Sequence, residues 1–150
     1  MKQQPSTLPL ELTQSLIAAA LSARGYSYSP YSRFAVGAAL LAENGQVYTG
    51  CNIENAAYTP TNCAERTAFF KAVSEGITQF TAIAIVGGPQ GTDLANAPLC
   101  APCGVCRQVM AEFCDAAQFQ IILAKSETDY QIFPLAELLP LGFTPASLQG

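Results

Sequence analysis

Histidine and tryptophan are absent from this 150-residue sequence, and positive charge is scarce. Without histidine, imidazole is excluded both as a metal ligand and as a general base, so these roles fall to other side chains. Lysine and arginine together number 7 against 11 aspartates and glutamates, which gives a net charge of −4. Because no basic run or basic–aromatic patch exists to follow a phosphate backbone, we expect no long nucleic acid as a partner. A small neutral substrate suits this charge balance better.

Long hydrophobic runs are also missing, so no membrane partner is expected. Half of the residues are apolar and 12% are charged, which predicts a well-filled core rather than disorder. The stretch LIAAALSA (residues 16–23) could imitate the apolar part of a signal peptide, but it continues a helical repeat that begins at Leu12. We prefer an amphipathic helix. A cytoplasmic location follows, where the six cysteines act as thiols or metal ligands rather than disulfides.

The hydrophobic patterns predict a helix, a hairpin around Asn44-Gly45, and then alternating helices and strands. The expected helices cover residues 10–23, 63–74, 103–113 and 135–139, and the expected strands cover residues 34–42, 46–51, 81–86, 120–124 and 130–133. This order predicts the α/β class, with three α/β/α layers around one central mixed sheet of about five strands. We expect a single domain over residues 1–150, with residues 1–7 as a frayed leader and residues 87–99 as a mobile loop.

Three cysteines are the main candidates for a functional site. Cys103 and Cys106, in LCAPCGVCR (residues 99–107), could hold zinc, cycle between dithiol and disulfide, or only pack. Cys63 changes this balance because it begins one expected helix, while the C-x-x-C pair begins another. Helix N-termini stabilise thiolates over thiols. Three thiolates on two neighbouring helix starts predict a tripod for zinc with an open fourth position, the arrangement of a catalytic site.

Two charged residues follow Cys63 closely. Three thiolates and one Zn²⁺ carry a net negative charge, which makes the metal a poorer Lewis acid than one held by neutral imidazoles. Arg66 is expected to partner a thiolate and to tune the metal, although it could simply be a solvated surface side chain. Glu65 is placed to take a proton from zinc-bound water, although an acid is favoured in a first helical turn anyway. The residues alone predict a zinc hydrolase with Glu65 as proton shuttle.

Four longer blocks carry a family resemblance. Cys-x-Glu followed by Pro-Cys-x-x-Cys resembles the all-cysteine form of the zinc nucleoside and nucleobase deaminase signature, in which the Glu is the general acid/base and not a ligand. The blocks that narrow it are GCNIENAAY (50–58), CAERTAFFKAVSEG (63–76), PCGVCRQVMAEFC (102–114) and ELLPLGF (137–143). They resemble the small homotetrameric cytidine deaminases, and the resemblance extends from about residue 16 to residue 143.

The resemblance implies a substrate, a cofactor and an assembly. Cys63, Cys103 and Cys106 would hold one zinc per subunit, with hydroxide in the fourth position attacking the amine-bearing ring carbon of cytidine or 2′-deoxycytidine. Glu65 would protonate the adjacent ring nitrogen and then the departing amine, releasing uridine or 2′-deoxyuridine and ammonia. The implied assembly is a homotetramer that shares its sites between subunits, and the implied role is pyrimidine salvage.

The substrate contacts are also implied by the resemblance. Asn52 and Glu54 match residues that hydrogen-bond the ribose hydroxyls, and one amide with one carboxylate suits a neutral sugar. Phe34 matches an aromatic residue that packs on the pyrimidine, and Ala64 a residue whose backbone meets the base edge. Without the resemblance, we would interpret Asn52 and Glu54 as an ordinary polar loop and Phe34 as a core residue.

Other positions are less fully assigned. Phe143 matches a residue that reaches into a neighbouring subunit's site, and Tyr58 either lines the pocket or packs at the subunit interface. Ala101 stands where the family often has a serine, so a hydrogen bond would be lost there. Three further cysteines have no assigned role and are expected to be buried apolar thiols, namely Cys51, Cys100 and Cys114.

Three other functions stay open from the sequence. A non-catalytic zinc module would use Cys100 or Cys51 as a fourth ligand, but it leaves Glu65 without a role. A related deaminase could act on a nucleoside antibiotic or a free base, although the NIEN stretch (residues 52–55) addresses a ribose. A C-x-x-C redox protein would carry no zinc, so the metal content separates it from the others.

Overall fold

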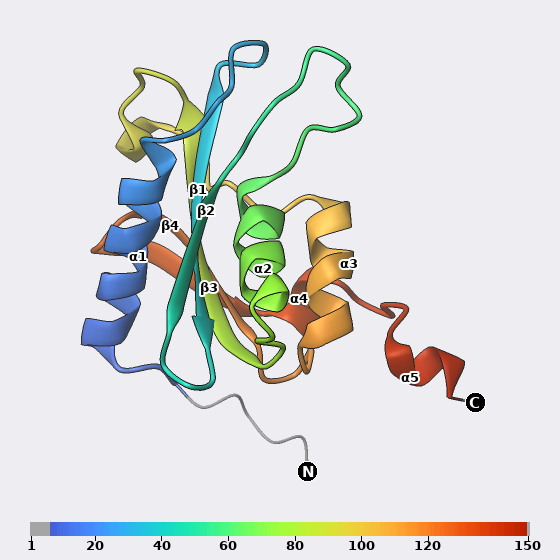
Figure 1. Cartoon of the computed structure of the whole chain (residues 1–150). Coiled ribbons are helices and arrows are strands. Elements are labelled where there is room, and N and C mark those ends of the chain that lie inside the picture. Colours follow the sequence, from blue (N-terminus) through green and yellow to red (C-terminus); the bar gives the residue numbers. More distant parts are fainter. Residues whose placement is uncertain (1–6, 150) are drawn as a thin grey trace.

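A five-stranded mixed sheet forms the centre of the computed structural model, which describes residues 7–149 (Figure 1). The strands are β1 (Phe34–Ala42), β2 (Val47–Cys51), β3 (Phe80–Pro89), β4 (Gln120–Ser126) and β5 (Asp129–Pro134), in the spatial order β2-β1-β3-β4-β5. Strands β3 and β4 are parallel, and the other neighbouring pairs are antiparallel. The predicted sheet is therefore confirmed. Of the predicted leader, residues 1–6 lie outside the described residues.

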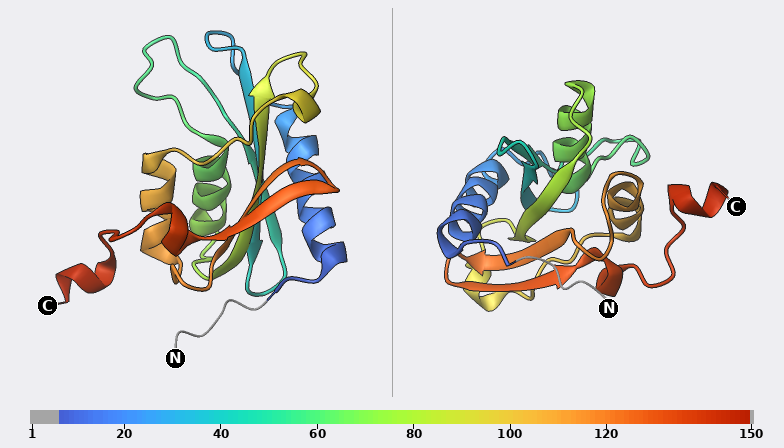
Figure 2. Two further views of the ribbon diagram at one scale, coloured as in Figure 1. Left: turned by 180° about the vertical axis from the view of Figure 1, so that it is seen from behind. Right: turned by 90° about the horizontal axis from the view of Figure 1, so that it is seen from below.

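The helices cover both faces of the sheet, which confirms the three-layer α/β/α architecture. They are α1 (Leu10–Arg24), α2 (Ala64–Ser74), α3 (Gly104–Phe113), α4 (Leu135–Leu138) and α5 (Pro145–Leu148). Helix α1 lies on one face, and α2 and α3 lie side by side on the other (Figures 1 and 2). The short helix α5, which the sequence did not predict, stands at the end of an extended segment away from the sheet.

Strand β1 divides the core into two clusters because its side chains alternate between the faces. Ala38 and Leu40 pack in the cluster that includes α2 and α3. Ala39 and Leu41 pack against α1, together with Leu16 and its neighbours. Eight of the nine β1 residues are buried, as a strand covered on both faces requires.

The predicted turn joins β1 and β2 through a hairpin loop of three residues, 43–45. The Gly45 N–H donates to the Ala42 carbonyl at 3.0 Å, and the Ala42 N–H donates to the Gln46 carbonyl at 2.9 Å. Gly45 has φ +90°, a left-handed conformation that glycine adopts at little cost. Asn44 does not have a positive φ, so the turn is a type I turn followed by a left-handed glycine rather than a two-residue type I′ turn.

The prediction of a loop over residues 87–99 is wrong for its first three residues. Gly87, Gly88 and Pro89 continue β3 and pair with the first residues of β1. Glycine at position 87 reflects a close approach, since a Cβ there would lie 2.7 Å from the Cys100 sulfur. A 3₁₀ turn (Leu94–Asn96) follows, and its Leu94 is buried against the α1 side of the sheet. Tertiary contacts therefore anchor a segment whose composition suggested mobility.

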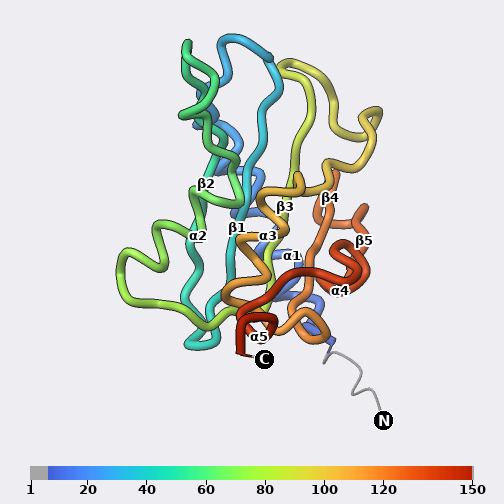
Figure 3. Tube along the Cα trace, turned by 90° about the vertical axis from the view of Figure 1, so that its right-hand side faces the viewer, coloured from blue at the N-terminus to red at the C-terminus, as the bar shows by residue number. Residues whose placement is uncertain are grey.

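Three connecting segments gather at one end of the sheet, near the start of α2 and α3 (Figure 3). They are residues 25–33 before β1, residues 52–63 between β2 and α2, and residues 90–103 between β3 and α3. This end of the fold thus brings together segments that lie far apart in the sequence, since three strands and a helix separate residues 25–33 from residues 90–103 along the chain. Among residues 7–149, no helix has the length and the apolar character needed to cross a membrane.

Candidate metal centre and active site

The three predicted ligands lie at the starts of two adjacent helices. Cys63 is the N-cap residue of α2, and Cys103 is the N-cap residue of α3. The Cys103 sulfur accepts a hydrogen bond from the backbone N–H of Cys106 at 3.4 Å, in the way a serine or aspartate oxygen caps a helix. Free N–H groups at a helix start stabilise negative charge on such a sulfur.

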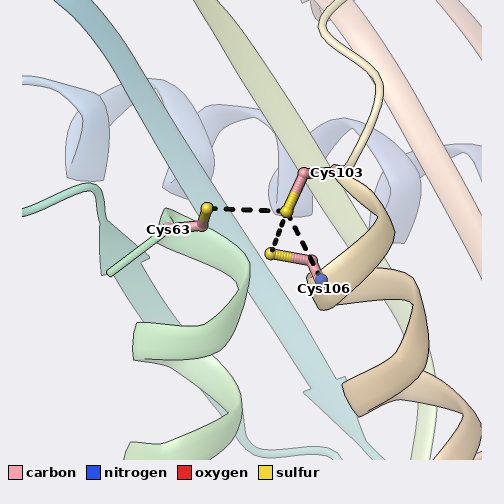
Figure 4. A group of neighbouring side chains, drawn as sticks. All are labelled: Cys63, Cys103 and Cys106. Atoms are coloured by element: carbon pink, nitrogen blue, oxygen red, sulfur yellow. Dashed lines mark hydrogen bonds between the residues drawn. The ribbon is translucent and has the colours of Figure 1, made fainter. Parts of the chain in front are cut away.

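The three sulfur atoms converge on one point, as Figure 4 shows. The sulfur of Cys103 lies 3.8 Å from that of Cys63 and 3.4 Å from that of Cys106, and all three lie within 4.8 Å of one another. Two sulfurs bound to one tetrahedral zinc at 2.3 Å would lie about 3.8 Å apart. The three thiols therefore fit a zinc ion in both donor type and spacing. Among the described residues, neither Cys51 nor Cys100 belongs to this group.

Contacts among the three thiols shift the pKa values of Cys63 and Cys106 in opposite directions. A hydrogen bond from the Cys106 thiol, supported by Arg66 and Cys103, lowers the pKa of the Cys63 thiol to about 5 against the effect of burial. The hydrogen bond to Cys63, together with burial, raises the pKa of the Cys106 thiol. Cys63 is therefore the thiol most ready to lose its proton, and the protons that remain on the three sulfurs leave when a metal ion binds.

Arg66 lies against this cluster. Its Nη2 donates to the Cys63 sulfur at 3.3 Å. Its Nε is buried and has no hydrogen-bond partner among the described residues. The guanidinium therefore places positive charge beside the thiolate, whereas the effect of that charge on a bound metal stays a prediction.

Glu65 lies in the first turn of α2 and is only 4% exposed. Burial raises the pKa of its carboxyl to about 7, far above that of a solvated glutamate. A carboxyl with this pKa can gain and lose a proton near neutral pH, which is what a general acid/base requires.

A cavity of about 210 Å³ opens beside the thiols and Glu65. Three of the predicted substrate contacts line it, namely Phe34, Asn52 and Ala64. The sequence analysis did not assign several other lining residues, which are Ser32, Val36, Thr61, Asn62, Cys100 and Ala101. The signal for Ser32 was its position in a Ser/Tyr/Pro loop directly before Phe34. The sequence suggested Cys100 as a buried apolar thiol or as the fourth ligand of a structural zinc site, and the structure places it in the lining of the cavity instead.

The remaining predicted contacts lie elsewhere in this chain. Glu54 and Tyr58 line a neighbouring hollow, which shares Ser32 and Thr61 with the cavity beside the thiols. The backbone N–H groups of Tyr31 and Ser32 donate to the Glu54 carboxylate at 2.9 and 3.1 Å. The two hollows are therefore adjacent, with Ser32 and Thr61 between them.

Phe143 does not reach the cavity of its own chain. It is 59% exposed and lines a separate groove over α3 and α5. Its contact with a neighbouring subunit stays a prediction.

The other cysteines are thiols in different surroundings. Burial raises the pKa of the Cys100 thiol to about 12, and burial also raises the pKa values of Cys114 and Cys51. All six cysteines are free. These three thiols therefore stay protonated at neutral pH, in contrast to Cys63.

Comparison with known proteins identifies the family. Residues 10–122 match the profile described as the cytidine and deoxycytidylate deaminase zinc-binding region. A cytidine deaminase of Sporosarcina psychrophila is 50% identical over 135 residues, which are 90% of this chain and 93% of the relative. One of Halalkalibacterium halodurans is 51% identical over 131 residues, 87% of this chain and 93% of the relative.

A solved structure shares the fold. The crystal structure of the Burkholderia pseudomallei cytidine deaminase superposes with a TM-score of 0.73 at 44% identity, and the match covers 86% of this chain and 97% of that one. The profile spans most of the chain, and the relatives align over nearly their full length. The chain therefore belongs to the family of zinc-dependent cytidine and deoxycytidylate deaminases.

Proposed function

We propose that this protein hydrolyses the amino group of cytidine and 2′-deoxycytidine, with water as the second substrate and ammonia as the second product. One observation carries the proposal. A buried carboxyl that titrates near neutrality, Glu65, shares a small cavity with a three-thiol metal site. This pairing provides a metal-assisted hydrolysis with a proton carrier beside it.

The residues divide the chemistry between them. When bound by Cys63, Cys103 and Cys106, zinc supplies a Lewis acid that lowers the pKa of water. Glu65 takes one proton from the attacking water and gives it to the ring nitrogen next to the amine-bearing carbon. It then takes the remaining proton from the oxygen that has added to the ring carbon and gives it to the departing amine, so that the C–N bond breaks, the carbonyl of the product forms and ammonia leaves. Glu65 is only 4% exposed, so a substrate that fills the cavity limits its proton exchange with bulk water.

The other side chains orient the nucleoside. Phe34 supplies an aromatic surface for the pyrimidine, and the backbone at Ala64 meets the edge of the base. Asn52 and Glu54 address the sugar hydroxyls, with Tyr58 at the outer rim. The Ser32 side chain, together with the backbone N–H groups of Ser32 and Tyr31, lowers the pKa of the Glu54 carboxyl, so it stays a charged acceptor at neutral pH.

We further propose a homotetramer in which Phe143 completes a neighbour's site, formed by chains that each fold as one domain. Large apolar side chains that are exposed in the single chain support the assembly, among them Phe70, Val105, Leu141, Phe143 and Leu148. Six free thiols suit a reducing compartment, so we propose the cytoplasm as the location and pyrimidine salvage as the role.

One assay tests this function directly. The loss of cytidine absorbance is followed on a sample whose zinc content is counted by elemental analysis, and deoxycytidine and cytosine are tested alongside. We expect turnover of both nucleosides, no turnover of the free base, and about one zinc per chain. Zinc without turnover of either nucleoside would refute the proposed substrate, and a protein without zinc would refute the proposed mechanism.

A further inference from the structure

The orientation of the Asn52 side chain is fixed by backbone groups of β1. Its Oδ1 accepts a hydrogen bond from the Val36 N–H at 2.9 Å, and its Nδ2 donates to the Phe34 carbonyl at 2.8 Å. A backbone N–H can only donate and a carbonyl can only accept, so the amide has one possible orientation here.

The amide of Asn52 has a single group left for a ligand. Its Oδ1 also accepts from the Ser27 hydroxyl, which occupies the second of its two lone pairs. One of the two Nδ2 hydrogens is bound by Phe34, and the other has no partner among residues 7–149. Since Asn52 lines the cavity, it offers the cavity one N–H donor and no acceptor.

The Ser27 hydroxyl is itself held by two further residues. Its only hydrogen goes to Asn52, so the 3.1 Å contact with the Ser29 hydroxyl must be a bond that Ser29 donates. The Gln90 Nε2 in turn donates to the Ser29 oxygen at 2.8 Å. Ser29 is 2% exposed, and the Gln90 N–H is anchored on the Arg33 carbonyl at 2.7 Å. Three consecutive hydrogen bonds thus run from Gln90 to Asn52, and each polarises the next.

We propose that Gln90, Ser29 and Ser27, which we call the serine relay, are positioning residues for substrate binding. The relay saturates the Asn52 oxygen, so that Asn52 can recognise only a hydrogen-bond acceptor, such as a sugar hydroxyl oxygen. It also connects the segment after β3 to Asn52, where we propose that the sugar binds. This inference rests on the proposed function for the identity of the substrate, but not for the orientation of the amide.

Steady-state kinetics of Ser27→Ala with cytidine test the relay. Loss of one supporting hydrogen bond is expected to raise KM about three- to tenfold, with kcat within about twofold of the wild type. Gln90→Ala acts one step further away and should raise KM less. Ser27→Thr retains the hydroxyl and should restore the wild-type KM. Ser15→Ala, an exposed position of α1, is the matched control and should change neither constant.

A double variant distinguishes action through Asn52 from general loss of structure. In an Asn52→Ala background, Ser27→Ala should raise KM no further, because the group that it positions is already gone. Independent multiplication of the two effects, or an unchanged KM in folded Ser27→Ala, would overturn the proposal.

A measurement without turnover keeps the two proposals separate. In ¹⁵N–¹H spectra of the ligand-free protein, the Asn52 side-chain hydrogens should exchange with water at least severalfold faster in Ser27→Ala than in the wild type. Equal exchange rates would overturn the relay even in an active enzyme. Absence of cytidine turnover in the wild type, with faster exchange in Ser27→Ala, would refute the proposed substrate and leave the relay standing.

Discussion

At the scale of single residues, Glu65 is subject to two opposing effects. The first turn of a helix favours a carboxylate by a fraction of a kcal/mol, through the free N–H groups and the helix dipole. Removal from water favours the neutral acid more strongly, and a pKa of about 7 shows that burial prevails. The position therefore suits proton transfer better than it suits the stability of α2.

Replacing Glu65 by glutamine tests its role in the reaction. Glu65→Gln keeps the shape of the side chain and removes its ability to exchange a proton, so we expect a folded protein with normal zinc content and turnover about 10²- to 10⁴-fold lower. Cytidine kinetics and zinc analysis on one sample measure this. Glu75→Gln, exposed just after α2, is the matched control and should retain full activity. Near-normal turnover of Glu65→Gln would disprove the proton-carrier role.

Removing the Cys100 thiol tests whether the metal site has three or four protein ligands. Cys100 lines the cavity but lies outside the group of three convergent sulfurs, so Cys100→Ala should keep about one zinc per chain and most of its activity. Zinc analysis after dialysis measures the outcome. Cys103→Ala, by contrast, should lose the metal. A loss of zinc in both variants would favour the four-cysteine module.

At the scale of elements, the contact between β2 and α2 determines the positions of Cys63 and Glu65. An added Cβ at Gly50 would lie 2.4 Å from the Ala64 carbonyl oxygen and 2.6 Å from the Ala68 nitrogen. Both atoms belong to the backbone of α2, so they cannot move without moving the helix. Because α2 carries Glu65 and follows Cys63, the absence of a side chain at Gly50 determines how closely these two residues approach the sheet.

A methyl group at this contact should therefore weaken the fold and the metal site together. We expect Gly50→Ala to lower the free energy of unfolding by about 1–3 kcal/mol and to reduce zinc retention. Urea unfolding with a parallel zinc count measures both. Gly104→Ala adds the same methyl group where no atom lies within 4 Å, so its stability should be equal or slightly higher. Equal stabilities for the two variants would contradict this packing argument.

The order of these elements was predictable, whereas some of their contacts were not. The hairpin, the helix spans and the buried strand followed from Asn44-Gly45, apolar periodicity and the TAIAIV run, and the zinc site followed from three cysteines at helix starts. The sequence could not show that Gly87–Pro89 extends β3, because pairing with β1 outweighs the local preferences of glycine and proline there. It also could not show the serine relay, which joins residues more than sixty positions apart.

At the scale of the whole molecule, the metal site joins the N-terminal ends of two helices that also pack against each other in the core. Helices α2 and α3 lie beside each other on the sheet, and each contributes ligands at its first residues. A bound ion therefore ties the segment after β2 to the segment after β3. Its binding free energy adds to the stability of the folded chain.

Removal of zinc should consequently destabilise the protein as a whole. At a free zinc concentration a thousand times the dissociation constant, binding contributes about 4 kcal/mol, so chelation should lower Tm by about 8 °C or more. Thermal unfolding with and without a chelator measures the change. Added Zn²⁺ should restore Tm, while Mg²⁺, which prefers oxygen ligands, should not. An unchanged Tm after verified loss of zinc would contradict this role.

The proposed assembly makes a different prediction, which concerns two subunits at once. Phe143→Ala should lose activity because a neighbour's site lacks its aromatic residue. When Phe143→Ala is co-expressed with Glu65→Gln, some sites combine an intact Glu65 with an intact Phe143 from the other chain. Mixed oligomers should thus exceed the activity of either parent, as measured after tandem affinity purification. No recovery in verified mixed oligomers would disprove a site shared through Phe143.

The hairpin turn at residues 43–46 has a practical consequence. All four residues are exposed, and they lie at the opposite end of the nine-residue strand β1 from Phe34 (Figure 1). Nine residues of strand span about 30 Å, so a surface linker or a dye attached at Asn44 would stand far from the cavity. The turn is therefore the natural point at which to immobilise the protein on a support while nucleosides enter from the other end.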